Sequence, residues 1–469
     1  MATEDAPMDD EEFEYPEITS FKRQVMSVRG GRVKYSRQVA AIISDFPFFG
    51  EIFGTIFAVP CLFLLGRKVS LVISQTLSLI VLGAHEYYSL SLRLPDQLFG
   101  LKEDFYCVVA EHACVRLTVF VMTVYVTEIA QPKFRAFFLG LFFVPFTISI
   151  FVGRNVFDID HLLNLAILIQ LFAGGLALLA PETPYWLALT GRSVAAERSF
   201  NHLTAGLGEP DDLEELLDAA AADAEARSVL NLSTPEFRAP LLKIVFMHLA
   251  TDGVCQVFMS KNKEPFEFFR YDIYYDHLQY VTGLLPQFIQ GVLPQFVQYF
   301  FPVTGCVLFE VFNFRFGRRT LYIGCVFATY VLYVCRFAAF VSGKVYLSWI
   351  FDSVCYLVGH MGGRPILLLI PAEIFPATMK EFGIASSEFL QIFFQINDYS
   401  HLDYTPTYHP YNLIRLSVVA LGLGLTYLYM PETKDLTLVQ TQQLGVQFEQ
   451  PVLHIIYSKD EDVGDADVI

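Results

Sequence analysis

Long apolar segments alternate with short polar connections along most of the chain. A membrane crossing needs about 20 mainly apolar helical residues, because the hydrocarbon core is about 30 Å thick and a helix rises about 1.5 Å per residue. We therefore predict an all-α polytopic membrane protein with about 11 spans. The segments lie at roughly 39–65, 69–90, 105–127, 137–154, 162–180, 240–260, 279–311, 320–341, 345–371, 382–396 and 411–430.

A polar stretch separates five of these segments from the other six. Within it, SVAAERSFNHLTAG and PDDLEELLDAAAADAEARSVLNL predict short amphipathic helices. The predicted regions are an acidic then basic N-terminal tail (1–36), an N-terminal helical bundle (37–180), a central loop (181–239), a C-terminal helical bundle (240–438) and an acidic tail (439–469).

Composition supports a membrane protein and argues against an enzyme. Of 469 residues, 54% are hydrophobic and only 17% are charged, which is below the charged content of about 25% typical of soluble domains. The net charge of −17 gathers in the two tails and in 209–225, so it indicates solvated segments and no nucleic-acid partner. The chain has no C-x-x-C, H-x-x-x-H, G-x-S-x-G or phosphate-binding loop, so we predict no catalytic residue, no metal and no cofactor.

Three short motifs occur twice, about half a chain apart. FLLGRK (63–68) pairs with RFGRR (315–319), TEIAQPKFR (127–135) with AEIFPATMK (372–380), and PETPYWLALTGR (181–192) with PETKDLTL (431–438). Such doubling predicts two related helical bundles.

The six motif copies resemble those of the sugar-porter branch of the major facilitator superfamily, over about residues 37 to 445. Within that branch they most resemble the facilitated trehalose and glucose transporters of arthropods. The resemblance implies a major facilitator fold of two pseudo-repeated bundles. It also implies a plasma-membrane location, with the central loop and the C-terminal tail in the cytoplasm.

In this family the motifs lie at cytoplasmic helix ends and form a bracket of opposite charges across the two bundles. The resemblance therefore implies ten cytoplasmic gate residues, namely Arg67, Lys68, Glu128, Arg135, Glu182, Arg318, Arg319, Glu373, Lys380 and Glu432. The alternative for each residue alone is a charge that marks the cytoplasmic side or reaches the lipid headgroups.

The chain departs from the family pattern at several bracket positions. Phe63 and Phe314 stand where the family has Asp, Tyr185 and Lys380 stand where it has Arg, and Ala136 replaces a Gly. Lys lacks the planar fork that binds a carboxylate with two nitrogens. We therefore expect the bracket to have fewer charged residues and weaker ion pairs than the family pattern.

The family's sugar-binding residues are also changed. Its tenth-helix Trp is Leu368 here, and its eleventh-helix Asn-Trp is Gln391 and Ile392. The substrate-binding candidates are Asp252, Gln256, Gln287, Gln290 and Gln391. Gln287 and Gln290 share one helix face at i, i+3 spacing. Such a pair could line a cavity, and the alternative role is a polar contact between helices.

The start of the chain conflicts with the family's topology. SRQVAAIIS resembles the beginning of the first helix and DFPFFGEIFGTIFAVPCLFLLGRK most of the second, while basic residues flank the run on both sides. A run of this length makes one crossing, so we expect that most of the first helix is missing. The alternatives are an N-terminus forced to the outside and an amphipathic stub at 37–47.

The leading hypothesis is facilitated transport of a sugar of the hexose or trehalose class through the lipid bilayer by alternating access, with loss of activity as one outcome of the missing helix. Two alternatives stay open. An organic-ion carrier of the same superfamily would place Asp252, Arg336 or Arg364 in the cavity, whereas a non-transporting relative would fill that cavity with Phe and Leu.

Overall fold

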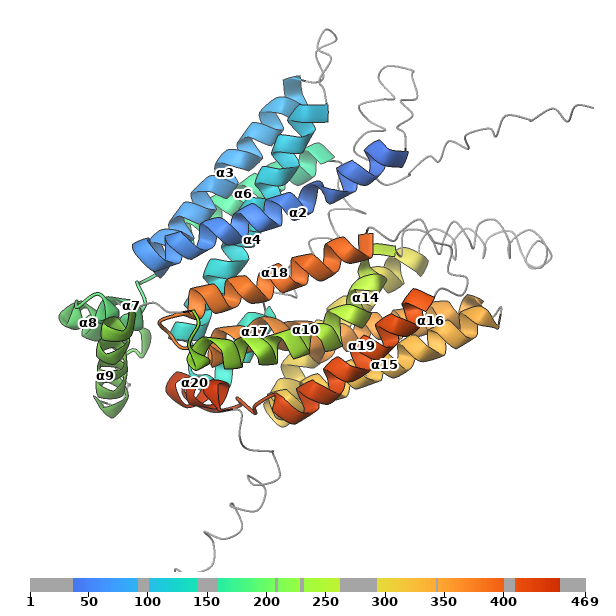
Figure 1. Cartoon of the computed structure of the whole chain (residues 1–469). Coiled ribbons are helices and arrows are strands. Elements are labelled where there is room, and N and C mark those ends of the chain that lie inside the picture. The colour runs from blue at the N-terminus through green and yellow to red at the C-terminus, as the bar shows by residue number, and fades with distance from the viewer. Residues whose placement is uncertain are drawn as a thin grey trace, which may run out of the picture.

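The computed structural model describes residues 37–91, 101–141, 159–206, 210–227, 232–261, 293–342, 345–399 and 410–447, and the regular elements over these ranges are helices. Figure 1 shows two groups of long helices, one from each half of the chain, with short helices at one end.

The N-terminal group is built around α4, which packs against both α2 and α3, while α3 also packs against α6. Its elements are α2 (Arg37–Pro60), the π-helical turn η1 (Cys61–Leu65), α3 (Arg67–Ser91), α4 (Leu101–Ile129), η2 (Pro132–Phe134) and α6 (Ile159–Leu179). Because α2 and η1 follow each other directly, 37–65 forms one helical stretch. The loss of a first helix stays a prediction.

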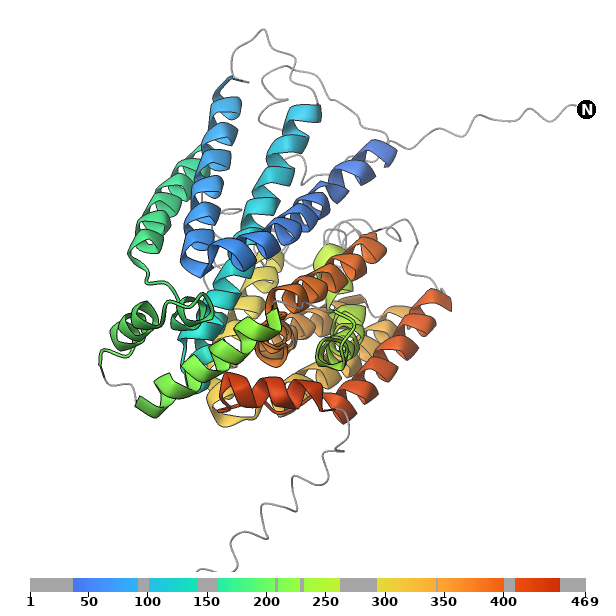
Figure 2. The same ribbon diagram turned by 60° about the vertical axis from the view of Figure 1, so that its left-hand side comes forward.

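The C-terminal group is built around α10, which packs against α18 and α19, and around the pair α15 and α16. Its elements are α10 (Pro235–Lys261), α14 (Leu293–Arg315), α15 (Arg318–Val341), α16 (Val345–Val358), the π-helical turn η4 (Gly359–Gly363), α17 (Arg364–Ile374), α18 (Lys380–Tyr399), α19 (Pro410–Tyr429) and α20 (Leu438–Val446). In Figure 2 the two groups lie side by side, and they meet where α2 packs against α18 and α4 packs against α17.

The two predicted short helices of the central loop are present as α8 (Ser193–Leu203) and α9 (Pro210–Arg227), and a further short helix that was not predicted, α7 (Pro184–Leu189), precedes them. The Thr183 side chain caps α7 by accepting from the Trp186 amide, and Pro184 follows at the first helical position, where a missing amide hydrogen costs nothing. These helices gather at one end of the molecule (Figure 1).

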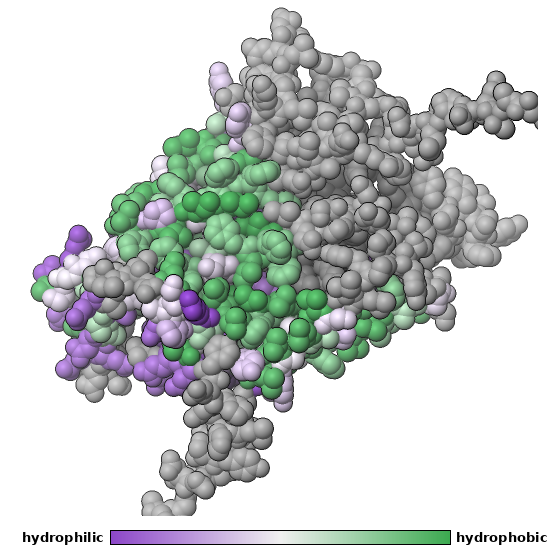
Figure 3. Space-filling model, viewed as in Figure 1, coloured by the Kyte–Doolittle hydropathy of each residue, from purple (hydrophilic) through white to green (hydrophobic). Residues whose placement is uncertain are grey.

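The outer surface of the long helices is apolar. On α6, for example, the side chains of Leu168, Phe172 and Leu179 are 64%, 69% and 79% exposed. Figure 3 shows this apolar surface over the long helices and a hydrophilic surface over the end that carries α7 to α9. An exposed apolar belt of this extent is typical of a surface that faces lipid.

Five helical stretches of the described residues are long and apolar enough to cross a membrane, at Phe48–Leu65, Arg67–His85, Tyr106–Ile129, Arg318–Ala339 and Ser353–Ile374. Two shorter apolar helices lie at Leu165–Leu179 and Leu416–Tyr429. Most of the predicted span 137–154 and the first half of 279–311 lie outside the described residues, so the number of 11 spans stays a prediction.

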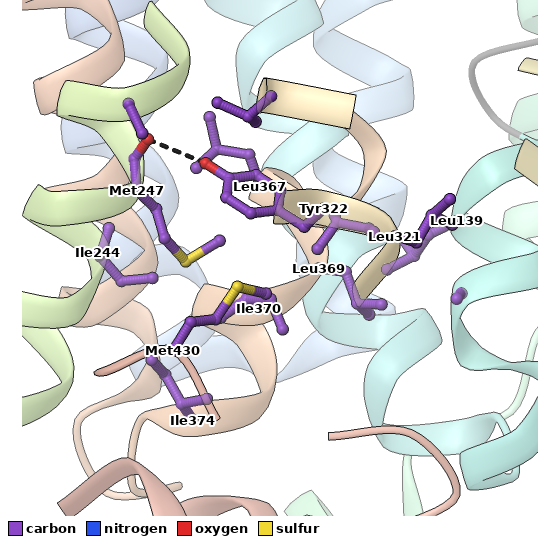
Figure 4. Packing of buried hydrophobic residues seen from close by; sticks show 14 of the residues in the cluster. Leu139, Ile244, Met247, Leu321, Tyr322, Leu367, Leu369, Ile370, Ile374 and Met430 are labelled. Atoms are coloured by element: carbon purple, nitrogen blue, oxygen red, sulfur yellow. Dashed lines mark hydrogen bonds between the residues drawn. The ribbon is translucent and has the colours of Figure 1, made fainter. Parts of the chain in front are cut away.

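The largest apolar cluster joins α10, α15 and α17 (Figure 4). Ile244, Met247, Tyr322, Leu369 and Ile370 are fully buried in it. The Tyr322 hydroxyl donates to the Met247 carbonyl at 2.9 Å, so a polar group inside the cluster is satisfied by the neighbouring helix.

Substituting Tyr322→Phe should lower the stability of the purified protein by about 1–2 kcal/mol, because the buried Met247 carbonyl loses its tyrosine donor. Thermal unfolding in detergent measures this loss. The matched control is Tyr427→Phe, whose side chain is 60% exposed. Equal melting temperatures for the two variants would contradict the expectation.

Candidate functional site: a charge bracket between the two bundles

The first motif copy places a basic residue at the start of a helix. Gly66 separates η1 from α3 with a φ of 93°, a conformation that favours glycine. A Cβ atom there would also lie 2.3 Å from the Trp186 ring nitrogen. The sharp turn brings the backbone amides of Arg67 and Lys68 toward Glu182 of the next motif.

Arg67 and Glu128 form a fork-to-fork ion pair. The Arg67 Nε lies 2.9 Å and 3.0 Å from the two carboxylate oxygens of Glu128, and Nη2 lies 2.7 Å from Oε1. Thr183 adds a hydroxyl bond of 2.8 Å to the same carboxylate. The Trp186 ring covers the guanidinium at 4.8 Å. Both charged side chains are 0% exposed, so each depends on the other for compensation.

Glu182 accepts from the start of α3 instead of pairing with a side chain. Its Oε1 takes the Arg67 amide at 3.0 Å and the Lys68 amide at 3.1 Å. A carboxylate at a helix N-terminus satisfies amides that have no partner within the helix. Burial raises the pKa of Glu182, and the amides of Lys68, Thr183 and Arg67 oppose that shift.

The second half of the chain repeats this unit. Arg318 Nη1 lies 2.5 Å from both carboxylate oxygens of Glu373, and Glu432 accepts the amides of Arg318 and Arg319 at 2.9 Å and 3.2 Å. The two partners of Arg67 lie 61 and 115 residues away, and those of Arg318 lie 55 and 114 residues away. The doubled motifs therefore form two copies of one three-dimensional unit.

Lys380 and Glu381, at the start of α18, connect the first unit to the C-terminal bundle. The Glu381 carboxylate lies 3.2 Å from Arg67 Nη2, and the Lys380 ammonium lies 3.8 Å from Glu128 Oε1. All four side chains are at most 1% exposed. A buried ion pair of the N-terminal bundle is thus shared with α18.

The second unit has a matching connection to the N-terminal bundle. Arg135 Nη1 lies 3.8 Å from Glu373 and donates to the Leu436 carbonyl at 3.2 Å, while Arg318 Nη2 donates to the Pro132 carbonyl at 3.0 Å. We call the two units and these cross-links the charge bracket. It comprises Arg67, Glu128, Arg135, Glu182, Arg318, Glu373, Lys380, Glu381 and Glu432.

Aromatic rings occupy the two positions where the family resemblance leads one to expect Asp. The Phe63 ring lies 6.2 Å from that of Phe382 in α18, and the Phe314 ring lies 6.2 Å from Phe134 and 5.7 Å from Phe137. Each pair joins the two bundles. Apolar contacts therefore flank the charges at both places.

The structure brings all ten predicted gate residues to this site, but two of them differ from the expected role. Lys68 and Arg319 contribute backbone amides to Glu182 and Glu432, and the Arg319 head group bonds to the Tyr427 carbonyl instead. Sequence reasoning missed Glu381, although it directly follows the motif lysine and is fully buried against Arg67.

The substrate-binding candidates are less completely placed. Asp252 and Gln256 belong to α10, but their side chains lie outside the described residues, as do Gln287 and Gln290 altogether. Gln391 lies on α18 and is partly buried. Their role stays a prediction.

The adjacent arginines Arg318 and Arg319 allow a test of the bracket geometry. Arg318→Lys keeps the charge but loses the fork that reaches Glu373, Thr433 and Pro132 together, so stability should fall by about 2–4 kcal/mol. Arg319→Lys is the control and should cost below about 1 kcal/mol, because its head group makes one carbonyl bond at the surface. Thermal unfolding in detergent compares them, and equal losses would refute a special role for Arg318.

Comparison with known structures shows the fold. The proton:xylose symporter XylE bound to 6-bromo-6-deoxy-D-glucose superposes with a TM-score of 0.69 at 15% identity, over 91% of this chain and 94% of that one. The inward open conformation of XylE from E. coli gives 0.54 at 14% identity, over 86% and 88%. The human organic anion transporter MFSD10 gives 0.45 at 12% identity, over 92% and 90%. This architecture is that of a major facilitator transporter.

Sequence comparison gives the family. No curated protein sequence matches the chain significantly. The family model described as "Sugar (and other) transporter" matches residues 14–444, nearly the whole chain. The protein is therefore an integral membrane transporter and not an enzyme, and it belongs to the sugar transporter family.

Proposed function

We propose that this protein facilitates the passage of a sugar of the hexose or trehalose class across the membrane by alternating access. The observation that carries the proposal is the charge bracket, in which each of the two matched units is linked to the opposite bundle. A contact that ties two bundles together at one end only can hold that end closed while the other end admits a solute.

The bracket favours one of two states by a difference in free energy that a substrate can offset. Its ion pairs are buried while the bundles touch, and separation exposes the released charges to water at the adjoining loops. Rehydration limits the cost of opening, whereas breaking a pair that stays buried costs about 3–5 kcal/mol. A solute that binds the opened state more tightly by a few kcal/mol then shifts the balance.

The orientation follows from the family motifs. We place the bracket, the helices α7 to α9 and α20 on the cytoplasmic side of the plasma membrane. The acidic 209–225 stretch and the hydrophilic end of the molecule suit that placement (Figure 3).

A sugar is the favoured substrate class because the family model spans almost the whole chain and the XylE structure holds a deoxyglucose derivative. Among the candidates, Gln391 lies on α18, eleven residues after Lys380. An amide at this position offers both a donor and an acceptor to a sugar hydroxyl. The resemblance of the motifs to those of arthropod trehalose and glucose transporters supports a sugar of the hexose or trehalose class.

The test is uptake of radiolabelled glucose and trehalose in transporter-deficient cells, with the surface level of the protein measured in parallel. The double variant Glu128→Gln/Glu373→Gln removes the fork-to-fork partner of Arg67 and the carboxylate partner of Arg318, and leaves Arg67 with Glu381 alone. Saturable uptake should fall by about tenfold or more, because the closed state loses several kcal/mol. The control, Glu197→Gln, removes an exposed charge from α8 and should transport like the parent protein.

Three other outcomes would contradict the proposal. Unchanged uptake by the double variant would remove the bracket from the mechanism. Saturable uptake of a labelled organic anion or cation in place of a sugar would identify the organic-ion alternative. Surface-exposed parent protein with no uptake of either class would support a transporter-like protein without transport.

A further inference from the structure

A second ionic contact joins the two bundles farther from the loops. Arg116 of α4 binds two carboxylates at once: its Nη2 lies 2.6 Å from Glu51 of α2, and its Nη1 binds Glu388 of α18. The side chains of Glu51, Arg116 and Glu388 are 19%, 12% and 4% exposed. We call these three residues the mid-span triad.

The triad and the charge bracket lie at two levels of the same helices. On α18, Glu381 of the bracket and Glu388 of the triad are seven residues apart, which is two helical turns or about 10 Å, so they share one face. On α4, Arg116 and Glu128 are twelve residues apart, or about 18 Å. Arg116 binds Glu388, and Glu128 lies 3.8 Å from the Lys380 ammonium, so both contact α18. Both helices therefore contribute two charged levels to one interface.

An apolar layer fills the interface between the two levels. One buried cluster holds Ala58 of α2, Leu62 of η1, Phe120 of α4, and Ile384 and Ala385 of α18, and none of these residues is more than 5% exposed. This layer separates the triad from the bracket and from the loops beyond it.

Close packing of α2 on α4 holds two members of the triad together. A Cβ atom on Gly54 of α2 would lie 2.3 Å from the Ala113 carbonyl of α4, so the two backbones are nearly in contact one turn from Glu51. His112 of α4 lies 4.0 Å from Glu51 as well. Glu51 and Arg116 are therefore fixed within one bundle, and Glu388 is the member that comes from the other.

The two charged levels respond differently when the bundles separate at the bracket end. Water follows the opening to the bracket charges, whereas the triad lies behind the apolar layer. Parting Arg116 from Glu388 there would leave a buried charge without its partner, which is among the most costly changes in a protein interior. In a rigid rotation the levels nearest the axis move least, so a contact that stays closed belongs near that axis.

Building on the proposed alternating access, we infer that the mid-span triad is the pivot of the interface between α2, α4 and α18. It stays closed while the charge bracket opens and closes. Arg116 is suited to this position because each of its two terminal nitrogens holds a carboxylate from a different bundle, which an ammonium cannot do with the same geometry.

The test compares Glu388→Gln with Glu373→Gln in the purified full-length protein. Amide hydrogen exchange of peptides covering 127–136 and 431–441 reports opening of the bracket, and thermal unfolding reports cohesion of the bundles. Glu373→Gln should accelerate bracket exchange by about tenfold or more. Glu388→Gln should leave that exchange within about twofold of the parent protein while lowering the melting temperature by several degrees. A pivot contributes equally to both states, so its loss changes stability and not their ratio.

A second variant covers a failure of Glu388→Gln to fold. Arg116→Lys keeps the charge and loses the double contact, so it should show the same pattern with a smaller fall in melting temperature. The inference is overturned if either triad variant accelerates bracket exchange as Glu373→Gln does, since the triad would then be a latch of one state. It is also overturned if the melting temperature does not change, or if no variant opens the bracket. These readouts need no transport, so they are independent of the uptake result.

Discussion

The architecture depends on one constraint: a charge buried between two bundles needs a partner, and the partner must be supplied by a defined helix. Arg67 and Arg318 are both at most 1% exposed, a burial that guanidinium groups tolerate only when paired and hydrogen-bonded. Each has a carboxylate from the end of a neighbouring span and a second carboxylate on the amides behind it. These ion pairs fix the starts of α3 and α15 against the ends of α4 and α17.

This constraint explains why the interface is layered. Apolar contacts alone do not fix the alignment of two helices, because apolar side chains of similar volume replace one another in a core at small cost. Ionic pairs give register but are costly when broken in a dry environment. Alternating the two along α18, with Glu381, Ile384 and Glu388 on successive turns, sets a unique alignment of the bundles.

The fold class and most residues of the bracket could be predicted from the sequence, because each motif occurs twice and the repetition indicates two related bundles. The sequence did not predict how the charges are used. Lys68 and Arg319 look like ion-pair partners in the sequence, yet their backbone amides do the binding, a role that no side-chain pattern reveals. Glu381 and Glu388 were overlooked because their partners come from the other bundle, and pairings so distant in the chain leave no local periodicity.

The substitutions at the family's Asp positions fit the same physical scheme. An Asp near the start of α3 or α15 would add a further carboxylate to a site where Glu182 and Glu432 already accept the amides. Phe63 and Phe314 instead pack on rings from the opposite bundle. Hydrophobic contacts are not screened by salt, whereas exposed charge pairs are. The bracket therefore has fewer charges than the family pattern but is flanked by apolar contacts, so contact between the bundles at this end depends on burial as well as on ion pairing.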